Sequence, residues 1–175
     1  IAPLNRMPGS KFFPKGRVNY AENMLSGDIS GPAIVFKSED KIRKEVSWKE
    51  LKVQVASLAN FLKIQGVTKG DRVAAYMPNM PETVIIMLAT SSIGAIFSSA
   101  SPDFGVEGVL DRFGQIEPKI LITTDGYWYN GKEIKITNKV IEAVKALPSL
   151  QKIVLAPLLE NKIDYNDDKF INYNC

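Results

Sequence analysis

The chain has 175 residues, of which 45% are hydrophobic; this suffices for one globular domain and excludes a disordered protein. Its 22 lysines and arginines stand against 19 acidic residues, a net charge of +3 with no long basic block, so we expect neither a nucleic acid nor a membrane surface as a partner. The absence of histidine excludes Ser-His-Asp and Cys-His catalytic sites and almost every transition-metal site, and we predict no metal site.

The single cysteine, Cys175, rules out an internal disulfide and favours a reducing compartment. The longest apolar run, Val84 to Ala89, is far shorter than the ~20 residues of a membrane span, and no signal peptide opens the chain. We therefore expect a cytoplasmic protein that does not cross a membrane. Because Ile1 is no initiator and a polar stretch precedes Cys175, we also expect the chain to be truncated.

Prolines and glycines interrupt any regular element in the first 32 residues, although Val18 to Leu25 could form a short helix. We predict that residues 1–32 form an irregular segment that packs on the domain that follows. The apolar run Ala33 to Phe36 then predicts a strand, with a polar turn over residues 38–41.

A capping box marks the start of the first long helix. Ser47 can accept a hydrogen bond from a first-turn amide while Glu50 reaches back to the Ser47 amide. Apolar residues then recur at helical spacing up to Gly66, which ends the helix. The segment 72–77 is the next predicted strand.

The second long helix is predicted to start at Asn79 and Pro81, which are both frequent at helix N-termini. Between Val84 and Leu88 this helix is apolar nearly all round, so we expect it to be buried on most sides. Gly94 ends it, and residues 95–98 predict another strand.

Two further helices and strands complete the pattern. A helix with one apolar face stops before Pro118, and a strand follows over residues 119–123. Another such helix ends at Pro148, and residues 152–156 form the last predicted strand. The apolar faces consist of Val106, Val109, Leu110 and Phe113 in the first case and Val140, Ile141, Val144 and Leu147 in the second.

Strands that alternate with helices over short connections indicate an α/β fold, with a mostly parallel sheet flanked by helices. We assign this fold to residues 33–157. Residues 158–175 lack a hydrophobic period in their polar part, and we assign them to a linker.

The dipeptide Asn130-Gly131 predicts a two-residue hairpin turn between residues 127–129 and 132–134, because both of its positions tolerate positive φ. The same stretch, Gly126 to Glu133, nearly matches a phosphate-binding P-loop. However, Glu133 stands where a serine or threonine hydroxyl should hold Mg²⁺, and its carboxylate would repel phosphate. We therefore reject a P-loop.

The run from Gly70 to Lys119 resembles the N-terminal domain of the AMP-forming acyl-CoA synthetases. Within that superfamily, the portion from Ala100 to Lys132 is most similar to the ligases that activate acetoacetate. The strings that carry this similarity are SPDFGVEGVLDRFGQIEPK and DGYWYNGK. The resemblance extends from about Phe12 to Ala156 and implies the large N-terminal domain of an acyl-adenylating enzyme.

This resemblance implies a ligase that uses ATP, as its magnesium complex, and coenzyme A to convert acetoacetate to its thioester through an acyl-adenylate. Two alternatives stay open: a ligase for another short acid such as acetate or propionate, and a free-standing, non-catalytic α/β binding module. The superfamily's ATP-binding motifs and catalytic lysine have no counterpart in this sequence, so no catalytic residue is assigned. We expect the chain alone to be inactive, with the remainder of the ligase as its packing partner.

In the related acetyl-CoA synthetases, the segment that matches residues 129–132 contacts the phosphorylated adenosine end of coenzyme A through basic side chains. The resemblance therefore implies coenzyme A contacts at Tyr129, Asn130, Gly131 and Lys132, of which Lys132 alone is basic. A solvated hairpin lysine is the other interpretation of Lys132, and both stay open.

Ser101 and Asp103 precede the third long helix, and we expect one of them to cap it. The resemblance also places their turn beside coenzyme A, where the free amides of a helix N-terminus suit an anion. Because the carboxylate of Asp103 would repel a phosphate, such a contact would run through backbone amides or through Ser101.

Overall fold

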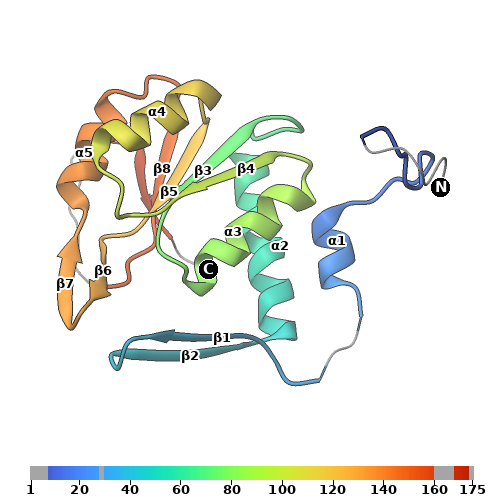
Figure 1. The fold of residues 1–175 in the computed structure, drawn as a ribbon, viewed down its shortest axis with the longest axis horizontal. Coiled ribbons are helices and arrows are strands. Elements are labelled where there is room, and N and C mark those ends of the chain that lie inside the picture. Colours follow the sequence, from blue (N-terminus) through green and yellow to red (C-terminus); the bar gives the residue numbers. More distant parts are fainter. Residues whose placement is uncertain (1–7, 28–29, 160–167, 174–175) are drawn as a thin grey trace.

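A computed structural model describes residues 8–27, 30–159 and 168–173. At its centre lies a parallel five-stranded sheet in the order β4–β3–β5–β8–β9 (Figure 1). The strands are β3 (Arg72–Tyr76), β4 (Ile96–Ala100), β5 (Ile120–Thr123), β8 (Lys152–Leu155) and β9 (Phe170–Asn172). The α/β fold with a mostly parallel sheet, predicted from the sequence, is confirmed.

Helices cover both faces of this sheet (Figure 1). One face packs against α2 (Trp48–Ile64) and α3 (Pro81–Ser92), and the other against α4 (Val106–Ile116) and α5 (Thr137–Lys145). Because side chains alternate along a strand, β3 serves both cores: its Val73 and Ala75 belong to the first, and its Ala74 and Tyr76 to the second. All four side chains have no solvent exposure.

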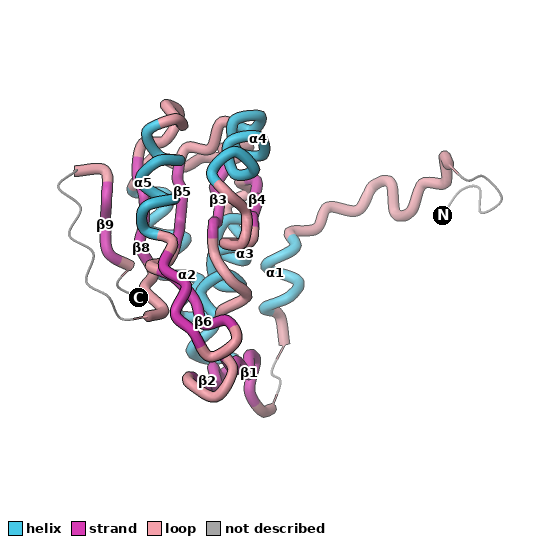
Figure 2. The backbone as a smooth tube through the Cα atoms, turned by 60° about the vertical axis from the view of Figure 1, so that its left-hand side comes forward, coloured by secondary structure: helices cyan, strands magenta, loops and turns pink. Residues whose placement is uncertain are grey.

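The helix α3 is buried on most sides, as its sequence predicts, and no residue from Pro81 to Ser91 is exposed. One of its neighbours is the short helix α1 (Tyr20–Leu25). The amide of Asn19 donates to the carbonyl oxygens of Ser91 and Ser92 at 3.0 and 3.1 Å, which fixes α1 to the end of α3. Residues 8–19 extend away from the body (Figure 2). The division of the chain at residues 32 and 157 stays a prediction.

Two antiparallel hairpins lie side by side at one end of the molecule (Figures 1 and 2). The first joins β1 (Pro32–Ser38) to β2 (Ile42–Ser47), and the second joins β6 (Gly126–Tyr129) to β7 (Lys132–Lys135). The sequence pattern predicts β1 and the second hairpin but not β2.

The predicted capping box of α2 is confirmed. The Glu50 amide donates to the Ser47 hydroxyl at 3.2 Å, and the Glu50 carboxylate accepts from the Ser47 amide at 2.8 Å. These bonds hold the pKa of Glu50 below its usual value, the backbone bond contributing most. Gly66 ends the helix with φ near +76°, as expected.

The predicted starts of α3 and α4 are wrong in detail. Pro81 lies in the first turn of α3, as predicted, but the N-cap residue is Met80, which makes no side-chain cap bond, so Asn79 does not cap the helix. The helix α4 follows Gly105, also without a side-chain cap, so neither Ser101 nor Asp103 caps it. The turn that contains these two residues is held instead by hydrogen bonds from the Tyr76 hydroxyl of β3.

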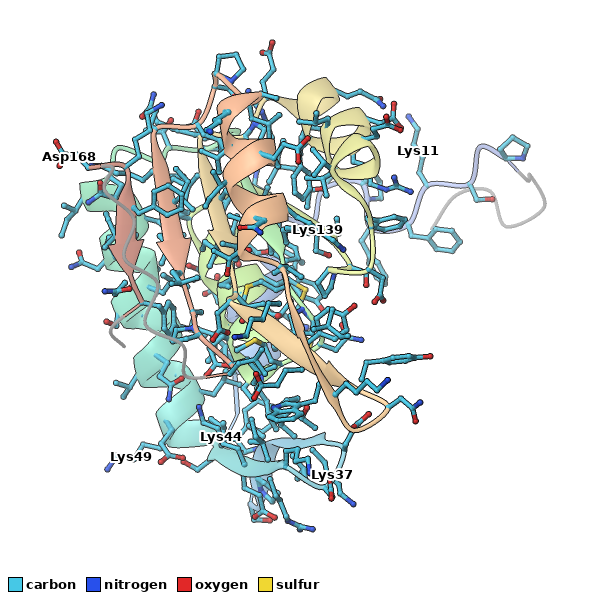
Figure 3. All side chains as sticks on the ribbon, turned by 90° about the vertical axis from the view of Figure 1, so that its left-hand side faces the viewer. Lys11, Lys37, Lys44, Lys49, Lys139 and Asp168 are labelled. Atoms are coloured by element: carbon cyan, nitrogen blue, oxygen red, sulfur yellow. The ribbon has the colours of Figure 1, made fainter. Side chains whose placement is uncertain are left out.

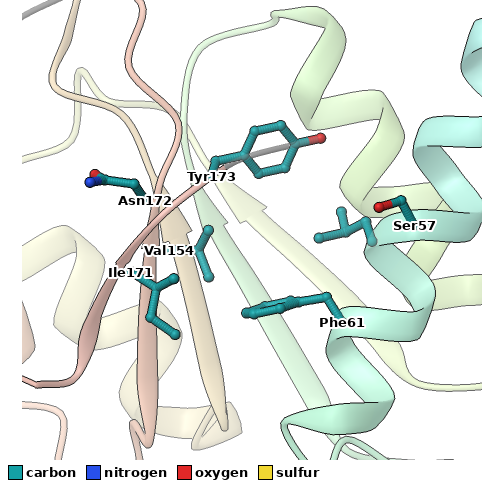
Figure 4. A pocket seen from close by; sticks show the side chains of 7 residues that line it. Ser57, Phe61, Val154, Ile171, Asn172 and Tyr173 are labelled. Carbon is teal, nitrogen blue, oxygen red and sulfur yellow. The ribbon is translucent and has the colours of Figure 1, made fainter.

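The strand β9 lies beyond residues 152–156, which the sequence pattern marks as the last strand, and that prediction is wrong. It pairs in parallel with β8. Between β9 and α2 lies a largely apolar pocket of about 250 Å³ (Figure 4). Among the described residues, no helix is long and apolar enough to cross a membrane.

Candidate functional site

The strand order places a candidate site at the carboxyl ends of β3, β4 and β5. In doubly wound sheets, ligands bind where the connections from neighbouring strands leave toward opposite faces, and here that point lies between β3 and β5. The hydroxyl of Thr123 donates to the carbonyl oxygen of Tyr76 at 2.9 Å and ties the two strands together there. The turn after β4 and the hairpin after β5 both leave the sheet from this edge.

The hairpin β6–β7 turns at Asn130 and Gly131, whose φ angles of 51° and 73° confirm the predicted positive-φ turn. Its register pairs Tyr129 with Lys132 and Tyr127 with Ile134. Directly opposed residues share a face, so Tyr127, Tyr129 and Lys132 lie on one side of the hairpin. The Tyr129 side chain is 68% exposed, and Lys132 is exposed as well.

The turn after β4 contains Ser101 and Asp103. The Ser101 hydroxyl donates to one carboxylate oxygen of Asp103 at 2.8 Å, and the Asp103 amide donates back to that hydroxyl at 3.3 Å. The buried Tyr76 hydroxyl donates to the carbonyl oxygens of Pro102 and Phe104 at 3.2 and 2.6 Å. These bonds from β3 hold residues 101–104 as a turn of their own, which explains why α4 starts later than predicted.

A hydrogen bond joins the hairpin to the turn: the Tyr127 hydroxyl donates to the second carboxylate oxygen of Asp103. The two segments for which the resemblance implies coenzyme A contacts are therefore in direct contact. Tyr127 is not among the residues singled out from the sequence. The signal that could have found it is its spacing of two from Tyr129, which places both on one strand face.

The charges around this bond are well defined. Hydrogen bonds from Tyr127 and then Ser101 hold the pKa of Asp103 below its usual value, and it is therefore ionised at neutral pH. Burial and the bond to Asp103 raise the pKa of Tyr127 to about 12. The ammonium group of Lys139, on α5, lies 3.4 Å from the Pro102 carbonyl oxygen and adds a positive charge behind the turn (Figure 3).

The first hairpin contacts the tip of the second. The Gly131 amide donates to the Glu39 carboxylate at 2.8 Å. The Lys41 ammonium lies 5.6 Å from the centre of the Trp128 ring, within the range of a cation–π contact. Trp128 belongs to the hairpin face opposite Lys132, because side chains alternate along β6.

These contacts limit how the site could hold a phosphate group. The Gly131 amide already donates its hydrogen bond to Glu39, and the Ser101 hydroxyl already donates its hydrogen bond to Asp103. On this hairpin face, the exposed ammonium of Lys132 is a group that could pair with a phosphate, and Tyr129 lies beside it. Within the described residues, no cluster of three acidic, histidine or cysteine side chains could hold a metal ion.

The sequence model of the AMP-binding enzyme family matches residues 29–171, which is most of the chain. The chain belongs to the AMP-binding enzyme family. This confirms the superfamily that the strings around residues 101–119 and 125–132 indicate.

Relatives within this AMP-binding family are acetoacetyl-CoA synthetases. The chain is 50% identical over 171 residues to the "Acetoacetyl-coenzyme A synthetase" of Rhizobium meliloti, an alignment that covers 93% of this chain and 26% of the relative. It is 46% identical to the "Acetoacetyl-CoA synthetase" of Rattus norvegicus, with 88% and 24% of the two chains covered. The chain thus spans about a quarter of the length of these curated relatives.

A solved structure agrees with these relatives. The acetoacetyl-CoA synthetase from Streptomyces lividans superposes on the chain with a TM-score of 0.87 at 41% sequence identity. The superposition covers 95% of this chain and 26% of that one. The described fold is therefore the fold of the corresponding quarter of that synthetase.

Proposed function

We propose that this chain is part of an AMP-forming ligase that converts acetoacetate to acetoacetyl-CoA. The observation that carries the proposal is the 50% identity to an acetoacetyl-CoA synthetase along nearly the whole chain. The superposition on the Streptomyces lividans synthetase supports the same function. The family match alone supports only the broader class of AMP-binding enzymes.

The reaction has two steps. The acetoacetate carboxylate attacks the α-phosphorus of ATP, pyrophosphate leaves, and an acyl-adenylate forms. The thiolate of coenzyme A then attacks the acyl carbon, and AMP leaves with the electrons of the broken acyl–phosphate bond. ATP, supplied with Mg²⁺, and coenzyme A are therefore the proposed co-substrates.

This chain is proposed to form one wall of the coenzyme A site and to leave the chemistry to other parts of the ligase. Lys132 would pair with a phosphate of the nucleotide end, and Tyr129 and the Asn130–Gly131 turn would flank it. Ser101 and Asp103 would line the wall from the neighbouring turn, with Ser101 as a hydrogen-bond acceptor because its proton is engaged. The cytoplasmic location expected from the sequence stays a prediction.

Pyrophosphate exchange tests the proposal. The full-length protein that carries this chain is given ATP and one acid at a time from acetoacetate, acetate and propionate, and thioester formation is then measured with coenzyme A. Acetoacetate is expected to support both reactions best. Stronger exchange with acetate or propionate would replace acetoacetate as the substrate, and exchange with none of the acids would contradict a ligase. The 175-residue chain alone is expected to catalyse neither step.

A further inference from the structure

The hairpin β6–β7 depends on outside contacts for its orientation. It is a separate two-stranded sheet of four-residue strands, and such a hairpin is marginally stable by itself. At its tip it is held by Glu39, through the Gly131 amide. Near its base it is held by the hydrogen bond from Tyr127 to Asp103.

The Tyr127–Asp103 hydrogen bond lies on the hairpin face that carries the residues proposed to contact coenzyme A. Tyr127 lies on the same face as Tyr129 and Lys132, because their register pairs put all three on one side. Two residues of extended strand, about 7 Å, separate Tyr127 from the Tyr129–Lys132 pair. A change in how Tyr127 is held therefore changes where the Lys132 ammonium lies relative to the turn.

The partner of Tyr127 is itself fixed to the sheet. Asp103 lies between Pro102 and Phe104, whose carbonyl oxygens both accept from the Tyr76 hydroxyl. The Tyr76 side chain is completely buried in β3. A chain of hydrogen bonds thus runs from the central sheet through the turn to the hairpin, and Tyr127 is its last member.

We propose that Tyr127 is a positioning residue for coenzyme A: its hydroxyl, bound to Asp103, holds the Lys132 face of the hairpin in register with the turn after β4. This inference rests on the proposed function. The bond has a neutral donor and an ionised acceptor over the whole physiological pH range, since the Asp103 pKa is lowered and the Tyr127 pKa is raised. The wall is therefore organised before coenzyme A arrives.

The kinetic test uses the full-length protein and acetoacetate. Tyr127→Phe keeps the ring and removes the donor, and we expect the KM for coenzyme A to rise roughly fivefold because a hydrogen bond to a charged group is lost. Pyrophosphate exchange, which does not involve coenzyme A, is expected to stay within about twofold of the wild-type rate. Tyr20→Phe is the matched control, because Tyr20 lies on α1 and its side chain is 54% exposed; it should change neither quantity.

Asp103 variants separate positioning from a general loss of structure. Asp103→Ala removes the contacts of both Tyr127 and Ser101 with this carboxylate, so it should raise the KM for coenzyme A at least as much as Tyr127→Phe. The double variant should raise it no further than Asp103→Ala alone, because the Tyr127 hydroxyl then has no carboxylate to bind. Asp103→Asn keeps an acceptor oxygen for the Tyr127 hydroxyl and should retain most of the wild-type affinity. Effects of the two single changes that multiply in the double variant would overturn the proposal.

Hydrogen exchange of the full-length protein tests the contact without any assumption about the reaction. Amides of residues 126–135 are expected to exchange faster in Tyr127→Phe than in the wild type, and unchanged in Tyr20→Phe. Unchanged hydrogen exchange of these amides in Tyr127→Phe would show that the Tyr127–Asp103 bond does not hold the hairpin. Faster exchange with an unchanged KM for coenzyme A would overturn its positioning role. A wild-type protein without acid-dependent exchange of pyrophosphate would instead contradict the proposed function.

Discussion

The carboxylate of Asp125 accepts hydrogen bonds from the backbone amide of Leu158 at 2.7 Å and from that of Leu159 at 3.0 Å. Asp125 is only 1% exposed, and the Thr124 hydroxyl donates to the same oxygen at 3.1 Å. Through this buried carboxylate, Asp125, which directly precedes β6, is bound to the segment that follows β8. It holds the base of the candidate hairpin against the end of the sheet.

Replacing Asp125 with alanine should lower the free energy of unfolding by roughly 2–4 kcal/mol, because the buried Leu158 amide and the partly buried Leu159 amide would lose their acceptor. Asp125→Asn, which keeps one acceptor oxygen, should lower it by less. Urea denaturation of the purified chain measures both. The control is Asp111→Ala on the exposed side of α4, where a change below about 0.5 kcal/mol is expected. A denaturation midpoint for Asp125→Ala equal to that of the control would contradict the anchoring role.

Two glycines should respond oppositely to the same substitution. A methyl group on Gly126 would overlap the Ile134 carbonyl oxygen and the Leu159 side chain, so Gly126→Ala should destabilise the chain by about 2 kcal/mol or more. Gly114 lies within α4 with open space around its Cα, so Gly114→Ala should stabilise it by roughly 0.5–1 kcal/mol. Thermal unfolding measures the change in Tm of each variant, which should be negative for Gly126→Ala and positive for Gly114→Ala. Changes in Tm of the same sign would contradict the described packing.

Local sequence patterns were sufficient where a short segment determines its own structure. The capping box of Ser47 and Glu50 and the Asn130-Gly131 turn are both correct, because their hydrogen bonds and φ angles involve neighbours in the sequence. The parallel sheet followed from the alternation of strands with helices.

Elements that depend on distant partners escaped prediction. The strand β9 has three residues, and its pairing with β8 makes it a strand. The strand β2 is hidden by three consecutive charged residues at its centre, Arg43 to Glu45. The contact between Asp103 and Tyr127 spans 24 residues, and the caps expected from Ser101 and Asp103 are displaced by bonds from Tyr76 on another strand. No local pattern contains these relationships.

Alkaline pH should destabilise the chain through Tyr76. Burial, followed by the charge of Asp103, raises the pKa of Tyr76 to about 12, whereas an unfolded tyrosine ionises near 10. Below pH 10 both states are protonated and the contribution is constant. Above pH 10 the unfolded state loses its proton first, so Tyr76 alone should lower the free energy of unfolding by about 1 kcal/mol by pH 11. Tyr127, whose pKa is also raised to about 12, acts in the same direction, so the share of Tyr76 is the difference between the wild type and Tyr76→Phe.

Urea denaturation at a series of pH values, with tyrosinate absorbance as a second signal, measures this effect of Tyr76. Tyr76→Phe, although less stable at neutral pH because it lacks the two bonds to the turn, should lose less stability between pH 9 and 11 than the wild type does. Equal pH slopes in the two proteins would show that Tyr76 does not retain its proton in the folded chain.

Lys132 decides whether the exposed face of the hairpin binds a phosphate. In the full-length protein that carries this chain, Lys132→Ala should raise the KM for coenzyme A roughly fivefold, since an exposed ammonium–phosphate pair contributes on the order of 1 kcal/mol. Pyrophosphate exchange should be unchanged, because coenzyme A takes no part in it. Lys135→Ala is the matched control: this exposed lysine of β7 lies an odd number of residues away and so on the opposite face.

A second test of the Lys132–phosphate contact removes the phosphate from the ligand instead of the lysine from the protein. With dephospho-coenzyme A, which lacks the phosphate on the ribose, Lys132→Ala should cost much less affinity than with coenzyme A. An equal loss with both thiols would mean that Lys132 contacts another part of the molecule. No loss with either would leave Lys132 as a solvated hairpin lysine, and equal losses in exchange and in thioester formation would indicate damage to the fold.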